Sequence, residues 1–222
     1  MGQLKNKVEL LGHYGSDEVI ACSAWTSTSR NLTDEKKARI PAMIETLWAN
    51  GHETPFEKGI VHFLVNVEQA THIHLLKHRI SSFNGESARY KELKEDKCYI
   101  PEDWPQKWQD TLKDYTDAGN ELYHHCLEEL TEELGRKRAK ESARFFKTYN
   151  SQIQADVTFN MRSFANFQKL RNSEHAQLEI RGVAQEMLSL VEKIEGNPFK
   201  FTLEAFSKRI FKEESIRHRQ DR

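Results

Sequence analysis

Two polar segments contain the residues whose types and spacing are suited to binding an anionic ligand. In the first, three cations are followed by a run of hydroxyl, amide and carboxylate side chains: Lys77, His78, Arg79, Ser81, Ser82, Asn84, Glu86, Ser87, Arg89 and Tyr90. Arginine binds phosphate through paired hydrogen bonds, and short polar side chains with backbone N–H groups complete an anion site. A solvated polar loop is the alternative, but a predicted strand and helix precede the segment directly, which favours presented binding groups.

The second segment begins at a predicted helix entry. It contains Asn160, Arg162, Asn166 and Arg171, with His175 further along. Exposed N–H groups and the helix dipole favour anions at such an entry. The alternative for this segment alone is an ordinary helix cap followed by solvent-facing charges.

Other chemistries are not indicated. His72, His74 and His78 suggest a metal site, but no carboxylate or cysteine completes a ligand set beside them and no HExxH motif occurs, so we predict no metal. Ser87 lacks the GxSxG turn of a hydrolase nucleophile. No glycine-rich nucleotide loop of the GxGxxG or Walker type is present.

Composition narrows the class of protein further. The 222 residues include 33 basic and 34 acidic side chains, a formal net charge of −1, which argues against a dedicated nucleic-acid binder. No apolar run approaches the roughly 20 residues of a membrane span, so no membrane association is expected. Three cysteines without CxxC spacing indicate neither a disulfide framework nor a zinc site, and the expected location is the reducing cytoplasm.

The predicted elements around both segments are mixed helices and strands without a βαβ rhythm. Strands are predicted at residues 8–11, 60–67 and 155–159, and helices at 33–50, 69–78, 105–134 and 140–146, with two more from 163 and 175. The long acidic helix has an apolar stripe formed by Trp108, Leu112, Tyr115, Leu122, Cys126 and Leu130. The fold class that follows is α+β, a single mostly helical domain over 1–222 with a small mixed or antiparallel sheet and a frayed basic tail at about 210–222.

Four blocks in the chain resemble, in the same order, the motifs of the flavin-dependent thymidylate synthases. Lys77-His78-Arg79-x7-Ser87 resembles the RHR-x7-S signature of that family, within a wider similarity over KHRISSFNGESARY (77–90). The other blocks are HETPFE (52–57), ESAR (141–144) and NMRSFANFQKLRNSEHAQLEI (160–180). Three positions depart from the family pattern: Lys77 replaces an arginine, Gly85 a glutamate (with Glu86 one place later) and His74 a glutamine.

The resemblance implies an enzyme that makes dTMP by reductive methylation of dUMP. It implies FAD as cofactor, methylenetetrahydrofolate as carbon donor, NADPH as reductant, and a homotetramer with active sites between subunits. The alternative is a catalytically impaired relative that still binds flavin or nucleotide, with Lys77 and Gly85 as the lesions.

Site residues are carried over by matched position. Those expected to contact FAD are Ser29, Thr54, Lys77, His78, Arg79, Asn160, Arg162 and Asn166. Those expected to hold dUMP are His74, Lys77, Glu86, Ser87, Ala88, Arg89, Arg144 and Arg171. Arg171 is the expected catalytic residue, because a cation near N3 and O4 of uracil stabilises the charge that develops when C5 attacks the carbon donor.

Overall fold

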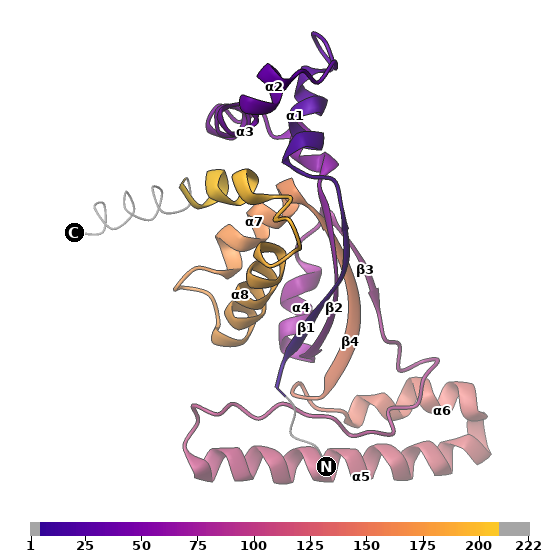
Figure 1. Ribbon diagram of the computed structural model, residues 1–222. Helices are drawn as coiled ribbons and strands as arrows, with labels where there is room; N and C mark the ends of the chain where they lie inside the picture. The colour runs from indigo at the N-terminus through magenta and orange to yellow at the C-terminus, as the bar shows by residue number, and fades with distance from the viewer. Residues whose placement is uncertain (1–4, 209–222) are drawn as a thin grey trace. The chain divides into compact units, whose positions relative to one another are not determined.

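The computed structural model describes residues 5–208, and the expected basic tail at 210–222 lies outside them. The fold is α+β, as predicted, with one small antiparallel sheet of four strands in the order β1-β2-β4-β3 (Figure 1). The strands are β1 (Lys7–Tyr14), β2 (Ile60–Glu68), β3 (Ser81–Gly85) and β4 (Gln152–Asn160). Along β2, buried and half-buried residues alternate from Ile60 to Val67, as the period-2 pattern of the sequence requires.

The chain divides into two compact units. Unit 1 comprises residues 5–7, 65–77 and 83–156, and unit 2 comprises 8–64, 78–82 and 157–208. The single catalytic domain expected from the sequence stays a prediction beside this division.

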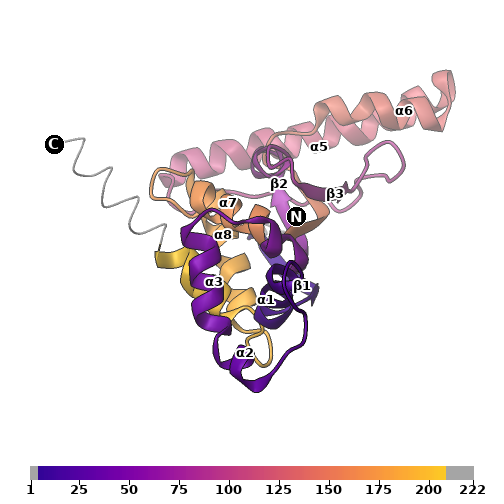
Figure 2. The ribbon, with the colours of Figure 1, turned by 90° about the horizontal axis from the view of Figure 1, so that it is seen from above.

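Unit 1 is built on a long helical hairpin. It contains α4 (Gln69–Leu76), α5 (Gln106–Leu134), α6 (Arg136–Ala143) and the short 3-10 helix η2 (Arg144–Phe146). Helices α5 and α6 lie side by side (Figures 1 and 2). Gly135 joins them with φ +78°, a left-handed conformation that glycine adopts without a steric cost.

The apolar stripe predicted along α5 is only partly its buried face. Trp108, Tyr115 and Leu122 are exposed, whereas Tyr123 and Leu127 pack against α6. The fully buried positions on α5 include small and polar residues as well, because Thr116 bonds Asn150 and Gly119 lies under the carbonyl oxygen of Phe146. Burial on this helix therefore depends on polar pairing and close backbone approach as well as on hydrophobicity.

Unit 2 contains α1 (Asp17–Trp25), α2 (Asp34–Ala38), α3 (Ile40–Ala49), η1 (Thr54–Lys58), α7 (Met161–Arg171) and α8 (Leu178–Glu192), and residues 200–208 are helical. Aromatic rings fill its core, where Phe164 contacts both Phe63 and Phe159. Asp17 at the start of α1 accepts hydrogen bonds from the backbone N–H groups of Phe201 (2.7 Å) and Thr202 (3.0 Å). These bonds tie the first helix to the last described one.

Several local predictions are corrected by the structure. The helix expected over 33–50 is interrupted at Arg39, because Pro41 lacks the N–H that a continuous helix would need. The helix expected over 140–146 is α6, which begins earlier and ends at Ala143. Residues 81–85, expected as part of a polar loop, form strand β3, and α1 was not predicted. No described helix is long and apolar enough to cross a membrane.

Candidate functional site

Glu86 begins the candidate site in unit 1, directly after β3 ends at Gly85. Its backbone N–H donates to the carbonyl oxygen of Gln154 (2.8 Å), and its carboxylate accepts from the Gln154 N–H (3.3 Å) and pairs with Lys91. These contacts extend the pairing between β3 and β4 by one residue. The Glu86 carboxylate is therefore held in place by its own backbone environment.

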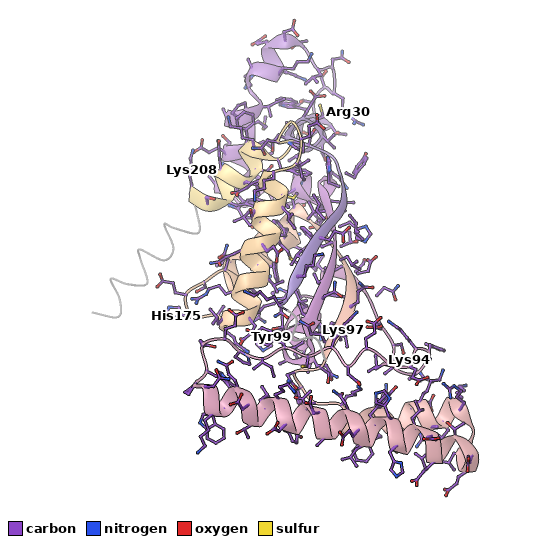
Figure 3. The ribbon with its side chains drawn as sticks, turned by 60° about the horizontal axis from the view of Figure 1, so that its bottom comes forward. Arg30, Lys94, Lys97, Tyr99, His175 and Lys208 are labelled. Carbon is purple, nitrogen blue, oxygen red and sulfur yellow. The ribbon has the colours of Figure 1, made fainter. Side chains whose placement is uncertain are left out.

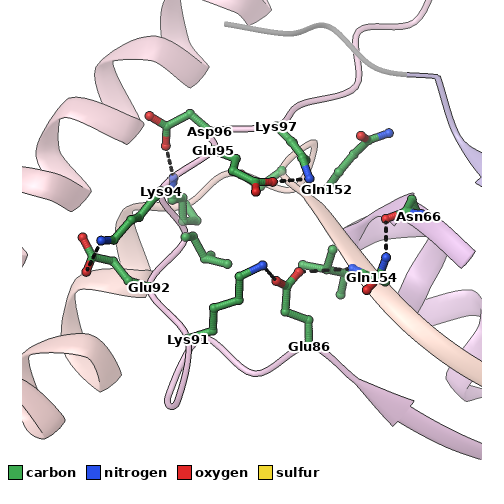
Figure 4. Close-up of a pocket in the computed structure, with 14 residues that line it drawn as sticks. Asn66, Glu86, Lys91, Glu92, Lys94, Glu95, Asp96, Lys97, Gln152 and Gln154 are labelled. Atoms are coloured by element: carbon green, nitrogen blue, oxygen red, sulfur yellow. Dashed lines mark hydrogen bonds and ion pairs between the residues drawn. The ribbon is translucent and has the colours of Figure 1, made fainter.

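The contacts of Glu86 form one wall of a pocket in unit 1 (Figure 4). The other walls are Asn66 of β2, the segment 91–97, Lys147, and residues 151–154 of β4 and the turn before it. Lys94 and Lys97 lie on the segment that precedes α5 (Figure 3). Each of the four lysines in the lining has an acidic partner there: the pairs are Lys91–Glu86, Lys94–Glu92, Lys97–Glu95 and Lys147–Asp96. The lining thus contains no excess of either charge and is not itself an anion site.

One of these pairs is partly buried, with Lys147 as its more buried member. The side chain of Lys147 is only 3% exposed, and its ammonium lies 2.5 Å from Asp96 Oδ1, 2.7 Å from Asn120 Oδ1 and 4.4 Å from the Tyr123 ring centre. His124 Nε2 donates to the other oxygen of Asp96 at 2.9 Å. Burial alone would raise the pKa of Asp96, but the hydrogen bonds from Lys147 and His124 outweigh it and hold that pKa below its usual value. The pair fixes segment 91–97 to α5.

Two of the arginines expected to hold dUMP, Arg89 and Arg144, share a partner. Arg89 donates from Nε to Glu141 Oε1 at 3.0 Å, and its Nη2 lies 3.0 Å from the same oxygen. Arg144 Nε donates to the backbone oxygen of Glu141 at 3.1 Å. The Arg89 guanidinium lowers the pKa of the Glu141 carboxyl. Glu141 therefore organises both arginines in unit 1.

In unit 2, the expected catalytic Arg171 contacts His78. Its Nε donates to His78 Nε2 at 3.0 Å, and the His78 ring packs edge-on against Phe167 with 4.9 Å between ring centres. His78 is one of the few buried charged or polar residues, at 8% exposure. The structure therefore brings the second residue of the RHR-like motif to the helix that carries Arg171.

At the N-terminus of α7, Asn160 and Arg162 already have hydrogen-bond partners within the protein. Asn160 caps the helix, since its side-chain oxygen accepts from the Ser163 N–H at 2.8 Å. Arg162 donates from Nε to Glu53 (3.0 Å) and from Nη1 to Glu57 (2.7 Å), both near η1. An anion that approaches Arg162 meets a guanidinium already bound to two carboxylates.

The expected site residues divide between the two units. Those in unit 1 are His74, Lys77, Glu86, Ser87, Ala88, Arg89 and Arg144. Those in unit 2 are Ser29, Thr54, His78, Arg79, Asn160, Arg162, Asn166 and Arg171. Within unit 1 the structure joins Arg89 and Arg144 through Glu141, and within unit 2 it joins His78 to Arg171. The ligand roles of the whole set stay predictions.

Some residues that organise these groups were not singled out from the sequence. Glu141 opens the ESAR block, but the block gave it no role. Lys147 and Asp96 are separated by 51 positions in the chain, and no local sequence pattern predicts that they pair. Among the described residues no group of three or more His, Cys, Asp or Glu side chains is arranged to hold a metal ion.

Comparisons with known proteins show which family the chain belongs to. The sequence model of Thy1, described as thymidylate synthase complementing protein, matches residues 9–197. The flavin-dependent thymidylate synthase of Thermotoga neapolitana is 33% identical over 220 residues, which cover 96% of each chain. That of Pseudothermotoga lettingae is 31% identical over 199 residues, which cover 84% of this chain and 85% of the other.

A solved structure agrees with these relatives. The UMP/dUMP methylase PolB from Streptomyces cacaoi, crystallised with 5-Br dUMP, superposes with a TM-score of 0.78 at 26% identity, covering 94% of this chain and 97% of that one. The motif-based recognition is thereby confirmed. The chain belongs to the thymidylate synthase complementing protein family, the family of the flavin-dependent thymidylate synthases.

Proposed function

We propose that this chain is a flavin-dependent thymidylate synthase that converts dUMP to dTMP by reductive methylation. Methylenetetrahydrofolate is the carbon donor, and FAD reduced by NADPH is the reductant. The observation that carries the proposal is the family match over residues 9–197, because it includes all four motif blocks. The dUMP analogue bound by the Streptomyces cacaoi methylase supports the choice of substrate.

Arg89 and Arg144 bind the 5′-phosphate of dUMP in this proposal. A nucleotide monophosphate carries about two negative charges near neutral pH, and charge-assisted hydrogen bonds from guanidinium groups are among the stronger polar contacts. Glu141 accepts from the Arg89 guanidinium through its carboxylate and from Arg144 Nε through its backbone oxygen. His74, Glu86, Ser87 and Ala88 complete the nucleotide contacts.

The residues assigned to FAD suit an anionic dinucleotide. Lys77 and Arg79 are exposed cations on either side of buried His78 in the sequence, and Ser29, Thr54 and Asn166 are exposed hydrogen-bonding side chains. This donor set fits the diphosphate and the polar edges of a flavin dinucleotide. When bound, the flavin supplies the reducing equivalents, and these residues bind and orient it.

Arg171 stabilises the transition state. Uracil must become electron-rich at C5 to attack the carbon donor, and negative charge then develops at N3 and O4. A guanidinium aimed at these atoms lowers the barrier, and removing one such donor costs about 10²–10³ in rate. We further propose a cytoplasmic homotetramer with active sites between subunits.

The proposal is tested by the flavin spectrum. After incubation with FAD and desalting, the protein should retain a flavin absorbance that shifts when dUMP is added. Arg171→Ala should keep the flavin spectrum and the fold but form dTMP about 10²–10³-fold more slowly. A colourless protein would contradict the FAD assignment, and full activity in Arg171→Ala would contradict the role of that residue. A monomer in light scattering would contradict the homotetramer.

A further inference from the structure

Two residues on one face of α7 contact His78. Phe167 and Arg171 are four residues apart, one helical turn, and both contact His78, which lies two positions beyond the end of α4. The ring of Phe167 meets the imidazole edge-on, and Arg171 Nε lies 3.0 Å from His78 Nε2. All three residues belong to unit 2, and His78 is buried at 8% exposure. The imidazole is thus fixed by packing on one side and by a hydrogen bond on another.

The contact defines the chemical form of His78. Arginine has only donors, so His78 Nε2 must be the acceptor. An imidazole with an acceptor at Nε2 is neutral and carries its proton on Nδ1. A protonated ring would have no acceptor there and would place two cations 3.0 Å apart. The geometry therefore requires the neutral Nδ1–H tautomer.

The same contact orients Arg171. The guanidinium is planar and rigid, so a hydrogen bond at Nε restricts the direction of the two terminal nitrogens. Within the described residues, His78 is the one side chain recorded as a hydrogen-bond partner of Arg171. The donors on the terminal nitrogens stay available for a ligand, in a direction set by the imidazole.

We propose that His78 is a positioning residue, which holds the Arg171 guanidinium so that its terminal N–H groups meet the uracil ring of dUMP. This inference rests on the proposed function, since it concerns the residue that stabilises the reacting base. It differs from the flavin contact that the resemblance assigns to His78, because here Nε2 of the ring is used by Arg171. His78 acts through Arg171 and does not touch the reacting atoms.

The kinetic test compares two substitutions at His78. His78→Phe keeps an aromatic ring against Phe167 but removes the acceptor, and we expect kcat for dTMP formation to fall about 10²-fold, the cost of a misplaced catalytic group. FAD affinity should change by less than about twofold, because His78 Nε2 is used by Arg171 and the other residues assigned to FAD are unchanged. His78→Gln offers an amide oxygen as acceptor and should recover about tenfold of the lost rate. His125→Phe, which replaces a 69% exposed histidine on α5, is the matched control and should behave as the unmodified protein.

A double mutant separates positioning from packing. Arg171→Ala is expected to keep a residual rate about 10²–10³-fold below that of the unmodified protein. In that background His78→Phe should cause no further loss of rate, because a residue that acts through Arg171 has nothing left to act on. An additive loss would overturn the proposal. So would full activity of His78→Phe, loss of FAD by that variant, or equal rates for the Phe and Gln variants.

The tautomer of His78 can be tested in the unmodified protein, without measuring activity and without a substitution. Nitrogen-15 spectra of the histidine rings in the unmodified protein should show His78 with a protonated Nδ1 and an unprotonated Nε2. An Nε2–H tautomer, or a doubly protonated ring at neutral pH, would overturn the contact. If the protein makes no dTMP but His78 has the expected tautomer, the proposed function fails and the Arg171–His78 contact stands.

Discussion

Lys147→Met removes the cation from the partly buried ion pair that holds segment 91–97 to α5. The methionine keeps a flexible apolar side chain of similar length, so most of the packing against Tyr123 is retained. What is lost is the ammonium that lies 2.5 Å from Asp96 and 2.7 Å from Asn120. Asp96 then keeps one recorded side-chain donor, His124.

The expected loss of folding stability in Lys147→Met follows from the burial of the pair. Removing one partner of a buried ion pair costs about 3–5 kcal/mol, because the other charge is left without compensation. Asp96 keeps 17% of its side-chain exposure and the donor from His124, so we expect the lower end, about 3 kcal/mol. For a protein of this size such a loss corresponds to a decrease in Tm of about 6–12 °C.

The assay is thermal unfolding followed by circular dichroism, with hydrogen exchange to locate the loss in residues 91–97. Lys147→Met/Asp96→Asn should recover at least about 1 kcal/mol over Lys147→Met, since the uncompensated charge is removed as well. The lowered pKa of Asp96 gives stability that is present above about pH 4 and lost as pH falls through the folded-state pKa. The difference between Lys147→Met and the unmodified protein should therefore narrow in acid. A Tm within 2 °C of the unmodified protein at neutral pH would refute the reasoning.

Three further substitutions have defined outcomes. Glu141→Gln releases Arg89 and should raise the Kd for dUMP about two- to fivefold in a flavin-shift titration, the range of exposed ion pairs; an unchanged Kd would exclude a positioning role. Gly59→Ala should destabilise the protein by about 1–3 kcal/mol, because the added methyl would lie 2.7 Å from the Met161 side chain; an unchanged Tm would show that the core relaxes around it. Lys77→Arg should preserve or increase dTMP formation, because arginine keeps the charge and adds the paired donors; total loss of activity would mean that the loop is organised differently.

The sequence predicted elements well where local signals mark both ends. Helix α5 was expected at 105–134 and lies at Gln106–Leu134, because Pro105 precedes it and Gly135 follows it. Strand β2 was likewise recognised from its β-branched, alternating run. Strand β3 was missed because its five residues show no clear alternation, and it pairs with β4, which lies about 70 positions further along the chain.

In the candidate site, too, the sequence motifs predicted individual residues but not the contacts between residues far apart in the chain. The motif blocks named Arg89, Arg144, Arg171 and His78, but not the pairing of Arg89 with Glu141 or of Arg171 with His78. Arg89 and Glu141 are 52 positions apart, and Arg171 and His78 are 93 apart. Such pairs depend on tertiary packing, which one sequence does not specify residue by residue.

The central claim is the reaction itself, and the most direct measurement is dTMP formation followed by mass spectrometry. The protein is incubated with FAD, NADPH, methylenetetrahydrofolate and dUMP, and each component is omitted in turn. We expect dTMP to accumulate only when every component is present, and its rate of formation to fall about 10²–10³-fold in Arg171→Ala. Retained flavin and bound dUMP without any dTMP would contradict the account and identify the chain as a catalytically impaired relative.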